Sequence, residues 1–348
     1  MGDQKTHGWS RREFLGGLAL AGTAAALGLQ PGLGMAAVEP PPETKTVRLR
    51  YWDPACWAPF YLAEPFLREE GFTDIRYVAV PTNELPDAYK KNLIDLSCGF
   101  SVVDMYHLEK ENSPHKFLSG FHVGCYALIG SDRVRSVRDL KGKTVWAGTL
   151  EYGGPHLFFS AIVAYVGLDP RKDIKYVWVK KDEALGLFNE GKIDAFMSFP
   201  PGPQELMAKG IGRLLVDTNV DKPWSQYFCC MMGGHSDYVK NYPIATKRAV
   251  RAILKAIDLV SREPATAARE LLARKIVKQK DEKYIIQALK EIPYGRWREY
   301  NPEDTIRFYA LRMRDTGLLK TNPQQFIDQH TDWRFIRELK KEFKITAW

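Results

Sequence analysis

The chain has 348 residues and a formal net charge of +8 at pH 7. This length is sufficient for one large or two medium domains with a real buried core. The positive charge is mild and spread along the chain, and acidic residues interrupt it where it concentrates, as between Arg334 and Lys344. We therefore interpret the basic residues as solvated helix faces and expect no nucleic-acid groove.

The first 37 residues have the three parts of an export signal. A positively charged stretch is followed by an apolar stretch at 15–29, and the segment closes at the small residues of 34–37. The apolar stretch is shorter than the ~20 residues that a membrane-spanning helix needs. The string S-R-R-E-F-L at 10–15 matches the twin-arginine pattern, which a receptor reads. The sequence therefore predicts twin-arginine export to the periplasm, with 38–45 as a linker.

The rest of the chain first alternates between strands and helices and then becomes helical. Residue patterns predict a first block with strands at 46–51, 75–80 and 94–98 and helices at 58–70, 85–92 and 102–109. A buried strand is predicted at 125–130, and a second block has strands at 144–146, 175–179 and 195–198 and helices at 155–166 and 182–189. The predicted C-terminal helices cover 245–262, 266–274, 282–289, 302–315 and 323–343. Two tandem βαβα blocks indicate an α/β fold.

Four stretches, taken together, resemble the periplasmic solute-binding proteins of the nitrate, sulfonate and taurine type. They are YWDPACWAPFYLA at 51–63, KKNLIDL at 90–96, VRDLKGKTV at 137–145 and FNEGKIDAF at 188–196. These proteins share a superfamily with the thiamine-pyrimidine synthases. The resemblance implies a two-lobed periplasmic binding protein fold of type II, with ligand held in the cleft between the lobes and hinged closure around it. Lobe I would comprise 46–126 plus 226–348, and lobe II would comprise 127–225.

The strand predictions indicate which loops line this cleft. In open parallel sheets, ligands bind outside the carboxyl ends of the strands. The loop after the first strand supplies Trp52, Asp53, Cys56 and Trp57, and the loop after the third supplies Cys98, Gly99, Phe100 and Ser101. The second block and the return crossing supply Thr149, Glu151, Tyr152, Gly153, His156, Ser198, Phe199 and Tyr227. Gly153 precedes a helix start that could offer backbone N–H groups.

The chemistry of these loops points to a particular class of solute. Aromatic rings would form flat walls of a small-molecule pocket at Trp52, Trp57, Tyr152 and Phe199. The loops contain the carboxylates of Asp53 and Glu151 but no Arg or Lys. A nitrogen-rich heterocycle or a weakly cationic ligand therefore fits better than nitrate or a sulfonate. Alternatively, either carboxylate caps a helix or meets solvent, and any of the rings belongs to the core.

Five cysteines raise the question of metal or disulfide chemistry. An odd number in an exported protein leaves at least one thiol unpaired if the others form disulfides. No C-x-x-C spacing occurs, and His122, His156 and His235 show no metal-ligand spacing. Cys98 with Cys229 and Cys230 could form a soft thiolate site for iron, zinc or copper. We favour the alternative that the thiols are buried and pack as small apolar groups.

These observations lead to one main functional hypothesis and two alternatives. We expect a monomeric binding component that delivers a small solute to the permease of an ABC transporter, with no cofactor and no catalysis. The first alternative is an enzyme similar to the thiamine-pyrimidine synthases, using pyridoxal phosphate and iron. Those synthases carry a catalytic Lys and His after the third strand, where this chain has C-G-F-S at 98–101, and Cys229-Cys230 only partly matches their Cys-rich motif. The second alternative is a periplasmic partner that presents bound ligand to a receptor.

Overall fold

The computed structural model describes residues 39–52, 54–279 and 281–346. The predicted export signal and Asp53 lie outside these residues. The chain from Pro41 to Trp348 forms one compact unit, which is described here by itself. In the described part of the chain, no helix combines the length and the apolar character needed to span a bilayer.

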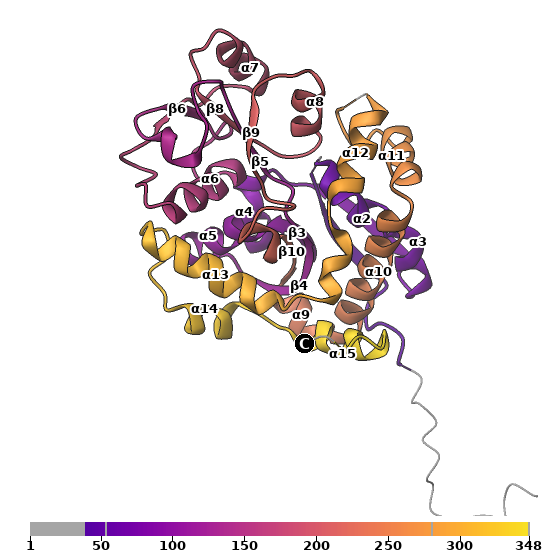
Figure 1. Cartoon of the computed structure of the whole chain (residues 1–348). Coiled ribbons are helices and arrows are strands. Elements are labelled where there is room, and N and C mark those ends of the chain that lie inside the picture. Colours follow the sequence, from indigo (N-terminus) through magenta and orange to yellow (C-terminus); the bar gives the residue numbers. More distant parts are fainter. Residues whose placement is uncertain (1–38, 53, 280, 347–348) are drawn as a thin grey trace, which may run out of the picture. The chain divides into compact units, whose positions relative to one another are not determined.

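Two five-stranded sheets organise this unit (Figure 1). Sheet A has the strand order β2-β1-β3-β10-β4, and sheet B has the equivalent order β7-β6-β8-β5-β9. In sheet A, β1 (Thr46–Tyr51) is parallel to β2 (Asp74–Ala79) and β3 (Leu96–Phe100), and β10 (Phe228–His235) is antiparallel to β3 and β4 (His115–Val123). In sheet B, β6 (Thr144–Trp146) is parallel to β7 (Lys175–Tyr176) and β8 (Ala195–Ser198), and β5 (Ala127–Gly130) is antiparallel to β8 and β9 (Arg213–Asp217).

Helices accompany each sheet and fill most of the C-terminal third. The helices following strands of sheet A are α2 (Ala58–Tyr61), α3 (Glu64–Glu69), α4 (Leu85–Lys90) and α5 (Ser101–Glu111), and those of sheet B are α6 (Gly154–Tyr165), α7 (Lys181–Asn189) and α8 (Gly202–Ala208). The C-terminal series is α9 (Ser236–Asn241), α10 (Pro243–Arg262), α11 (Pro264–Ala273), α12 (Glu282–Glu291), α13 (Pro302–Asp315), α14 (Pro323–His330) and α15 (Arg334–Glu342). The apolar face of α10 is buried along its length, from Ala245 to Val260.

We call the part around sheet A lobe I and the part around sheet B lobe II. The chain passes from β4 to β5 through 124–126 and returns from β9 to β10 through 218–227. These two crossing segments are hydrogen-bonded side by side. The Cys125 N–H donates to Asn219 Oδ1 at 3.0 Å, and the Tyr126 N–H donates to the Thr218 hydroxyl at 2.8 Å. The described residues from Pro41 onward form one compact unit, so the structure does not divide the chain at the predicted lobe boundaries. The boundaries at 126 and 226 therefore stay a prediction.

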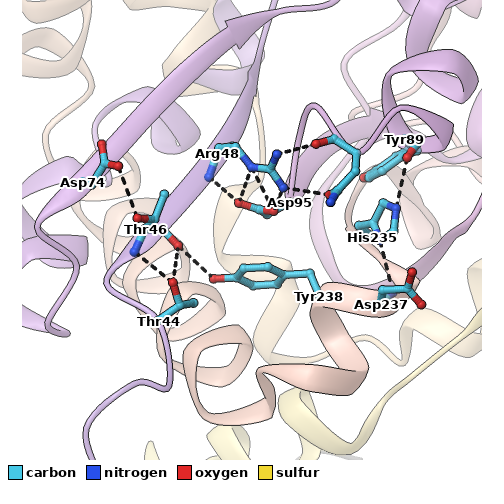
Figure 2. A network of polar contacts seen from close by, with 10 residues as sticks. Thr44, Thr46, Arg48, Asp74, Tyr89, Asp95, His235, Asp237 and Tyr238 are labelled. Carbon is cyan, nitrogen blue, oxygen red and sulfur yellow. Dashed lines mark hydrogen bonds and ion pairs between the residues drawn. The ribbon is translucent and has the colours of Figure 1, made fainter.

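The I-D pairs of two of the resembling stretches, at 94–95 and 193–194, have a structural role that is repeated in both sheets. Asp95 lies just before β3, and its carboxylate accepts from the Arg48 backbone N–H at 2.7 Å and from the Arg48 guanidinium (Figure 2). Asp194 lies just before β8 and accepts from the Thr144 N–H at 3.0 Å, with Arg133 2.9 Å away. Each Asp therefore joins two neighbouring parallel strands at their amino ends.

Several predicted elements differ from the observed ones. The predicted helix at 58–70 is divided into α2 and α3, and Pro65 lies at the start of α3, where its missing N–H is tolerated. The predicted helix at 323–343 is divided into α14 and α15, because Thr331 pairs with Phe117 of β4 and the Asp332 N–H donates to the Phe117 carbonyl. The third strand extends to Phe100 rather than ending at Cys98. Strands β4, β9 and β10 were not predicted.

Candidate ligand-binding site

Aromatic side chains from both lobes meet where the two sheets face each other. Trp52 follows β1, and its ring lies 5.4 Å from Trp57, 5.6 Å from Phe100 and 5.9 Å from Phe199 of lobe II. Phe100 also lies 5.5 Å from Tyr126 in the first crossing segment. These separations are typical of interacting aromatic pairs. We call this group the aromatic seam; its members are Trp52, Trp57, Phe100, Tyr126, Phe158 and Phe199. The sequence named four of the six.

The amino end of α6 closes tightly on the seam. Gly154 is the first residue of α6, and a Cβ at this position would lie 2.5 Å from Tyr126 Oη and 2.9 Å from Phe100 Cδ2. Phe158, one turn further along α6, stacks on Tyr126 with ring centroids 4.6 Å apart. Only Gly allows this approach between the helix and the lobe I rings. A solute that stacks between the rings therefore requires the lobes to part first.

The other candidates in and beside the loop before α6 are exposed or contact side chains outside the seam. Thr149 and Glu151 are exposed. Tyr152 stacks on Tyr106 of α5, with ring centroids 5.0 Å apart and an interplanar angle of 8°, and so contacts lobe I. His156 is buried inside lobe II, where its Nδ1 accepts from the Tyr152 N–H at 2.9 Å and its ring meets the edge of Tyr176. Burial lowers the pKa of His156 to about 4, so its ring is neutral at pH 7.

Of three further candidates, one donates hydrogen bonds to backbone carbonyls, one is buried at the end of a strand, and one lines a different groove. Ser101 donates to the carbonyls of Phe228 and Cys229, at 2.9 and 3.1 Å, and so joins α5 to β10. Ser198 is buried at the end of β8. Tyr227 stacks on Phe308 of α13 at 3.9 Å and lines a groove of about 580 Å³ with residues of α13. None of the rings of the aromatic seam lines that groove.

Cys98, Gly99 and Phe100 lie within β3, and Ser101 is the first residue of α5, so none of the four lies in the loop predicted after the third strand. The strand is longer because β10 pairs with it as far as Phe100. Gly99 leaves room for Asp104 of α5, since a Cβ there would lie 2.0 Å from the Asp104 carboxylate. Asp104 is buried, and neither carboxylate oxygen has a hydrogen-bond partner among the described residues. Burial raises its pKa to about 7, against the opposing effect of the Arg50 charge.

A buried cation beneath the seam escaped the sequence analysis. Arg50 is 1% exposed on β1, and its guanidinium lies 5.0 Å from the Trp57 ring centroid and 5.9 Å from that of Trp52. It donates to the carbonyls of Val80 and Cys98. Only loop residues were predicted to line the cleft, whereas Arg50 is the penultimate residue of a strand. An Arg that close to the carboxyl end of a strand is the signal that could have revealed it.

All five cysteines are buried and free. Cys125 Sγ lies 3.3 Å from Cys229 Sγ, and Cys230 Sγ accepts from the Trp57 indole N–H at 3.4 Å. One group of potential ligand atoms lies together in lobe I, all within 4.8 Å of one another: Cys56, His122, Cys125 and Cys230. Of these, the sequence analysis named only Cys230 as a metal candidate. It excluded His122 on spacing, although the ligands of a metal need to be close in space only.

Comparisons with known proteins agree with this architecture. Residues 128–277 match the model of the NMT1-like family. No curated protein sequence matches the chain. Among solved structures, the alkanesulfonate-binding protein SsuA of Xanthomonas axonopodis pv. citri aligns with a TM-score of 0.65 and 17% identity, covering 85% of this chain and 100% of that protein. The nitrate-binding protein NrtA of Synechocystis PCC 6803 aligns with a TM-score of 0.70 and 15% identity, covering 87% and 90%.

The periplasmic sulphonate-binding protein SsuA of Escherichia coli aligns with a TM-score of 0.63 and 14% identity, covering 81% of this chain and 91% of that protein. The fold is therefore the two-lobed fold of the periplasmic binding proteins. The resemblance to the nitrate and sulfonate type, inferred from the four sequence stretches, is confirmed. At these identities the likeness defines the architecture, and the solute of this chain has to be argued from its own residues.

Proposed function

We propose that this protein is the substrate-binding component of an ABC importer, which captures a small solute between its lobes and delivers it to a membrane permease. The fold and the match to the NMT1-like family support this role. The observation that carries it is the aromatic seam, because its rings come from both lobes. A solute that enters the seam contacts both lobes at once and so favours the closed form over the open one.

The chemistry of the seam favours a planar, neutral, nitrogen-containing heterocycle. A flat ring can take the place of a ring–ring contact such as that between Trp52 and Phe199, and each such contact contributes about 0.5–1.5 kcal/mol beyond its buried area. Arg50 places a positive charge beneath Trp52 and Trp57, which disfavours the weakly cationic ligand that the loops alone suggested. Glu151 is exposed in the loop before α6, and its carboxylate is an acceptor for hydrogen bonds from ring nitrogens.

Location and route are part of the same proposal. The twin-arginine string at 10–15 supports export of the folded chain to the periplasm, where a binding component meets its solute. We infer that the described chain acts as a monomer, with lobe I at 46–126 plus 226–348 and lobe II at 127–225. Fractionation of cells that produce the intact chain tests the route. Replacement of both arginines at 11 and 12 by Lys should leave the protein in the cytoplasm.

The binding role is tested by screening planar heterocycles, sulfonates and nitrate by thermal shift, followed by small-angle scattering with each stabilising compound. We expect a heterocycle to raise the melting temperature and to reduce the radius of gyration. Trp52→Ala and Phe199→Ala should abolish both effects. Trp178→Ala is the matched control, because Trp178 is 39% exposed and stacks on Tyr176 outside the seam.

Two results would contradict the proposal. If no compound stabilises the protein, or if binding survives both seam variants, the seam is not the binding site. An absorbance scan of the purified protein separates the enzyme alternative, since pyridoxal phosphate bound to a Lys gives a Schiff-base band. Detection of this band, together with conversion of the pyridoxal phosphate to a product, would indicate an enzyme and contradict the transport role.

A further inference from the structure

The four-residue group in lobe I, which we call the Cys₃His cluster, consists of Cys56, His122, Cys125 and Cys230. Its potential ligand atoms all lie within 4.8 Å of one another, and its side chains are 0–1% exposed. Each comes from a different part of the fold. Cys56 belongs to the turn Ala55–Trp57 after β1, His122 to the end of β4, Cys125 to the first crossing segment and Cys230 to β10, directly after the second.

The hydrogen bonds of His122 leave one ring nitrogen free for a ligand. Its Nδ1 lies 3.2 Å from the Val123 carbonyl oxygen, which can only accept, so Nδ1 carries the proton. Its Nε2 is buried and has no hydrogen-bond partner among the described residues. A buried polar atom without a partner costs about 1–3 kcal/mol. A histidine that donates one N–H to a backbone carbonyl and directs its other nitrogen at a metal has this same arrangement.

The geometry of the cluster suits a small tetrahedral ion. Around zinc, bond lengths of about 2.0–2.3 Å place the ligand atoms roughly 3.3–3.8 Å apart. Atoms within 4.8 Å of one another need a contraction of at most about 1.0–1.5 Å to reach that spacing. Three thiolates and one imidazole occupy all four positions, as in closed structural zinc sites. Thiolate-rich sets also hold iron(II) and copper(I), whereas magnesium and calcium prefer oxygen ligands.

The surroundings of the cluster hold its thiols in place. The Trp57 indole N–H donates to Cys230 Sγ at 3.4 Å, an outer contact of the kind that orients a thiolate ligand. Cys125 has φ = 91°, a backbone conformation that side-chain-bearing residues rarely adopt. The Asn219 side chain accepts from its N–H at 3.0 Å and so stabilises this conformation. Strained backbone of this kind is found at functional sites, where the surrounding structure maintains it.

We propose that Cys56, Cys125 and Cys230, as thiolates, and His122, through Nε2, bind a single thiolate-preferring metal ion, for which zinc is the best match. Binding releases three thiol protons to solvent and changes no oxidation state. The ion joins the first crossing segment, β4 and β10 to the turn that carries Trp57, and so it stabilises the ends of both strands from which the chain crosses between the lobes. This site adjoins the aromatic seam through Trp57, and the proposal does not depend on which solute the protein carries.

One competing arrangement uses the same residues. Cys125 Sγ lies 3.3 Å from Cys229 Sγ, so an oxidising compartment could join these two thiols in a disulfide and remove Cys125 from the ligand set. The predicted twin-arginine route favours the metal, because a chain that folds before export meets metal ions while its thiols are reduced. The two arrangements differ in composition. The metal-bound form contains one metal ion, whereas the disulfide form has two hydrogen atoms fewer than the reduced chain.

The first experiment measures composition. The intact chain is purified without chelators, and its metal content is determined by plasma mass spectrometry. We expect about one equivalent of zinc, iron or copper per chain, and the element found identifies the ion. Removal of the metal under reducing conditions and addition of Co²⁺ should then give the thiolate-to-cobalt charge-transfer band and the intense visible bands of a tetrahedral site. Absence of stoichiometric metal together with absence of the cobalt spectrum overturns the proposal.

Matched variants test the ligand set. Cys125→Ser and His122→Ala should each lower metal content at least tenfold, whereas Cys229→Ser should retain it, because Cys229 is the neighbouring thiol outside the cluster. Circular dichroism of each variant separates loss of metal from loss of fold, and the cobalt spectrum of the unchanged chain decides if the variants do not fold. An intact mass that lacks two hydrogens, with Cys125 and Cys229 in one cross-linked peptide, overturns the proposal. Loss of metal in Cys229→Ser alone overturns this choice of ligands.

Discussion

Gly154→Ala should create a steric clash between α6 of lobe II and the aromatic rings of lobe I. The new Cβ would lie 2.5 Å from Tyr126 Oη, which is 0.9 Å inside the 3.4 Å at which ordinary van der Waals contact begins. It would also lie 2.9 Å from Phe100 Cδ2. Overpacking of a well-packed region typically costs about 1–3 kcal/mol, so we expect a loss of about 2 kcal/mol in the free energy of unfolding, or an equivalent opening of the lobes.

The structure supplies both a control and a rescue for this variant. Gly186→Ala in α7 meets no atom within 4 Å, and as a Gly-to-Ala change inside a helix it should stabilise by about 0.5–1 kcal/mol. Tyr126→Phe removes Oη, which is buried without a hydrogen-bond partner among the described residues. The double variant Gly154→Ala/Tyr126→Phe should recover about 1 kcal/mol, and the recovery is partial because the Phe100 contact remains.

Urea denaturation measures the free energy of unfolding of the unchanged protein, Gly154→Ala, Gly186→Ala, Tyr126→Phe and the double variant. Small-angle scattering measures the radius of gyration of each. We expect Gly154→Ala to be less stable or more extended than the unchanged protein, and the double-mutant cycle to show a favourable coupling between positions 154 and 126. The reasoning fails if Gly154→Ala behaves like Gly186→Ala in both measurements. It also fails if Tyr126→Phe adds to the Gly154→Ala defect without relieving it.

Two further predictions concern the buried polar groups. Because burial lowers the pKa of His156 to about 4, the unfolded chain takes up its proton first as the pH falls below about 6.5, and stability is lost between these values. At pH 5 the loss of stability amounts to about 2 kcal/mol. His156→Asn keeps an acceptor for the Tyr152 N–H and should reduce the difference in the free energy of unfolding between pH 7 and pH 5 by that amount. An unchanged difference in urea denaturation would contradict the assignment. Asp95→Ala should cost about 3 kcal/mol in urea denaturation, because it leaves the Arg48 N–H and guanidinium without their buried partner. Asp194→Ala, at the equivalent but more exposed position of lobe II, should cost about 1 kcal/mol, and equal losses at both positions would show that burial is not the deciding factor.

Local sequence patterns were sufficient for several of the regular elements. The predicted bounds of β1, β6, β8 and α13 agree with the observed ones. The order of the βαβα blocks, together with the four resembling stretches, predicted the two-lobed fold correctly. Strand β10 was missed because its residues run F-C-C-M-M-G-G-H, without the alternation of a half-buried strand, and β3 and β4 cover it on both sides.

The candidate site was likewise predictable from the sequence only in part. The sequence by itself determined that aromatic residues follow the strands of both blocks, because that requires only the strand order and the rule that parallel strands present their carboxyl ends at one edge. Only the tertiary structure decided which side chains meet. Trp52 reaches Phe199 because the crossing segments bring the lobes face to face, and Tyr227 turns instead towards α13. The Cys₃His cluster exists because the first crossing segment, the turn after β1, β4 and β10 converge, and no spacing along the chain records that convergence.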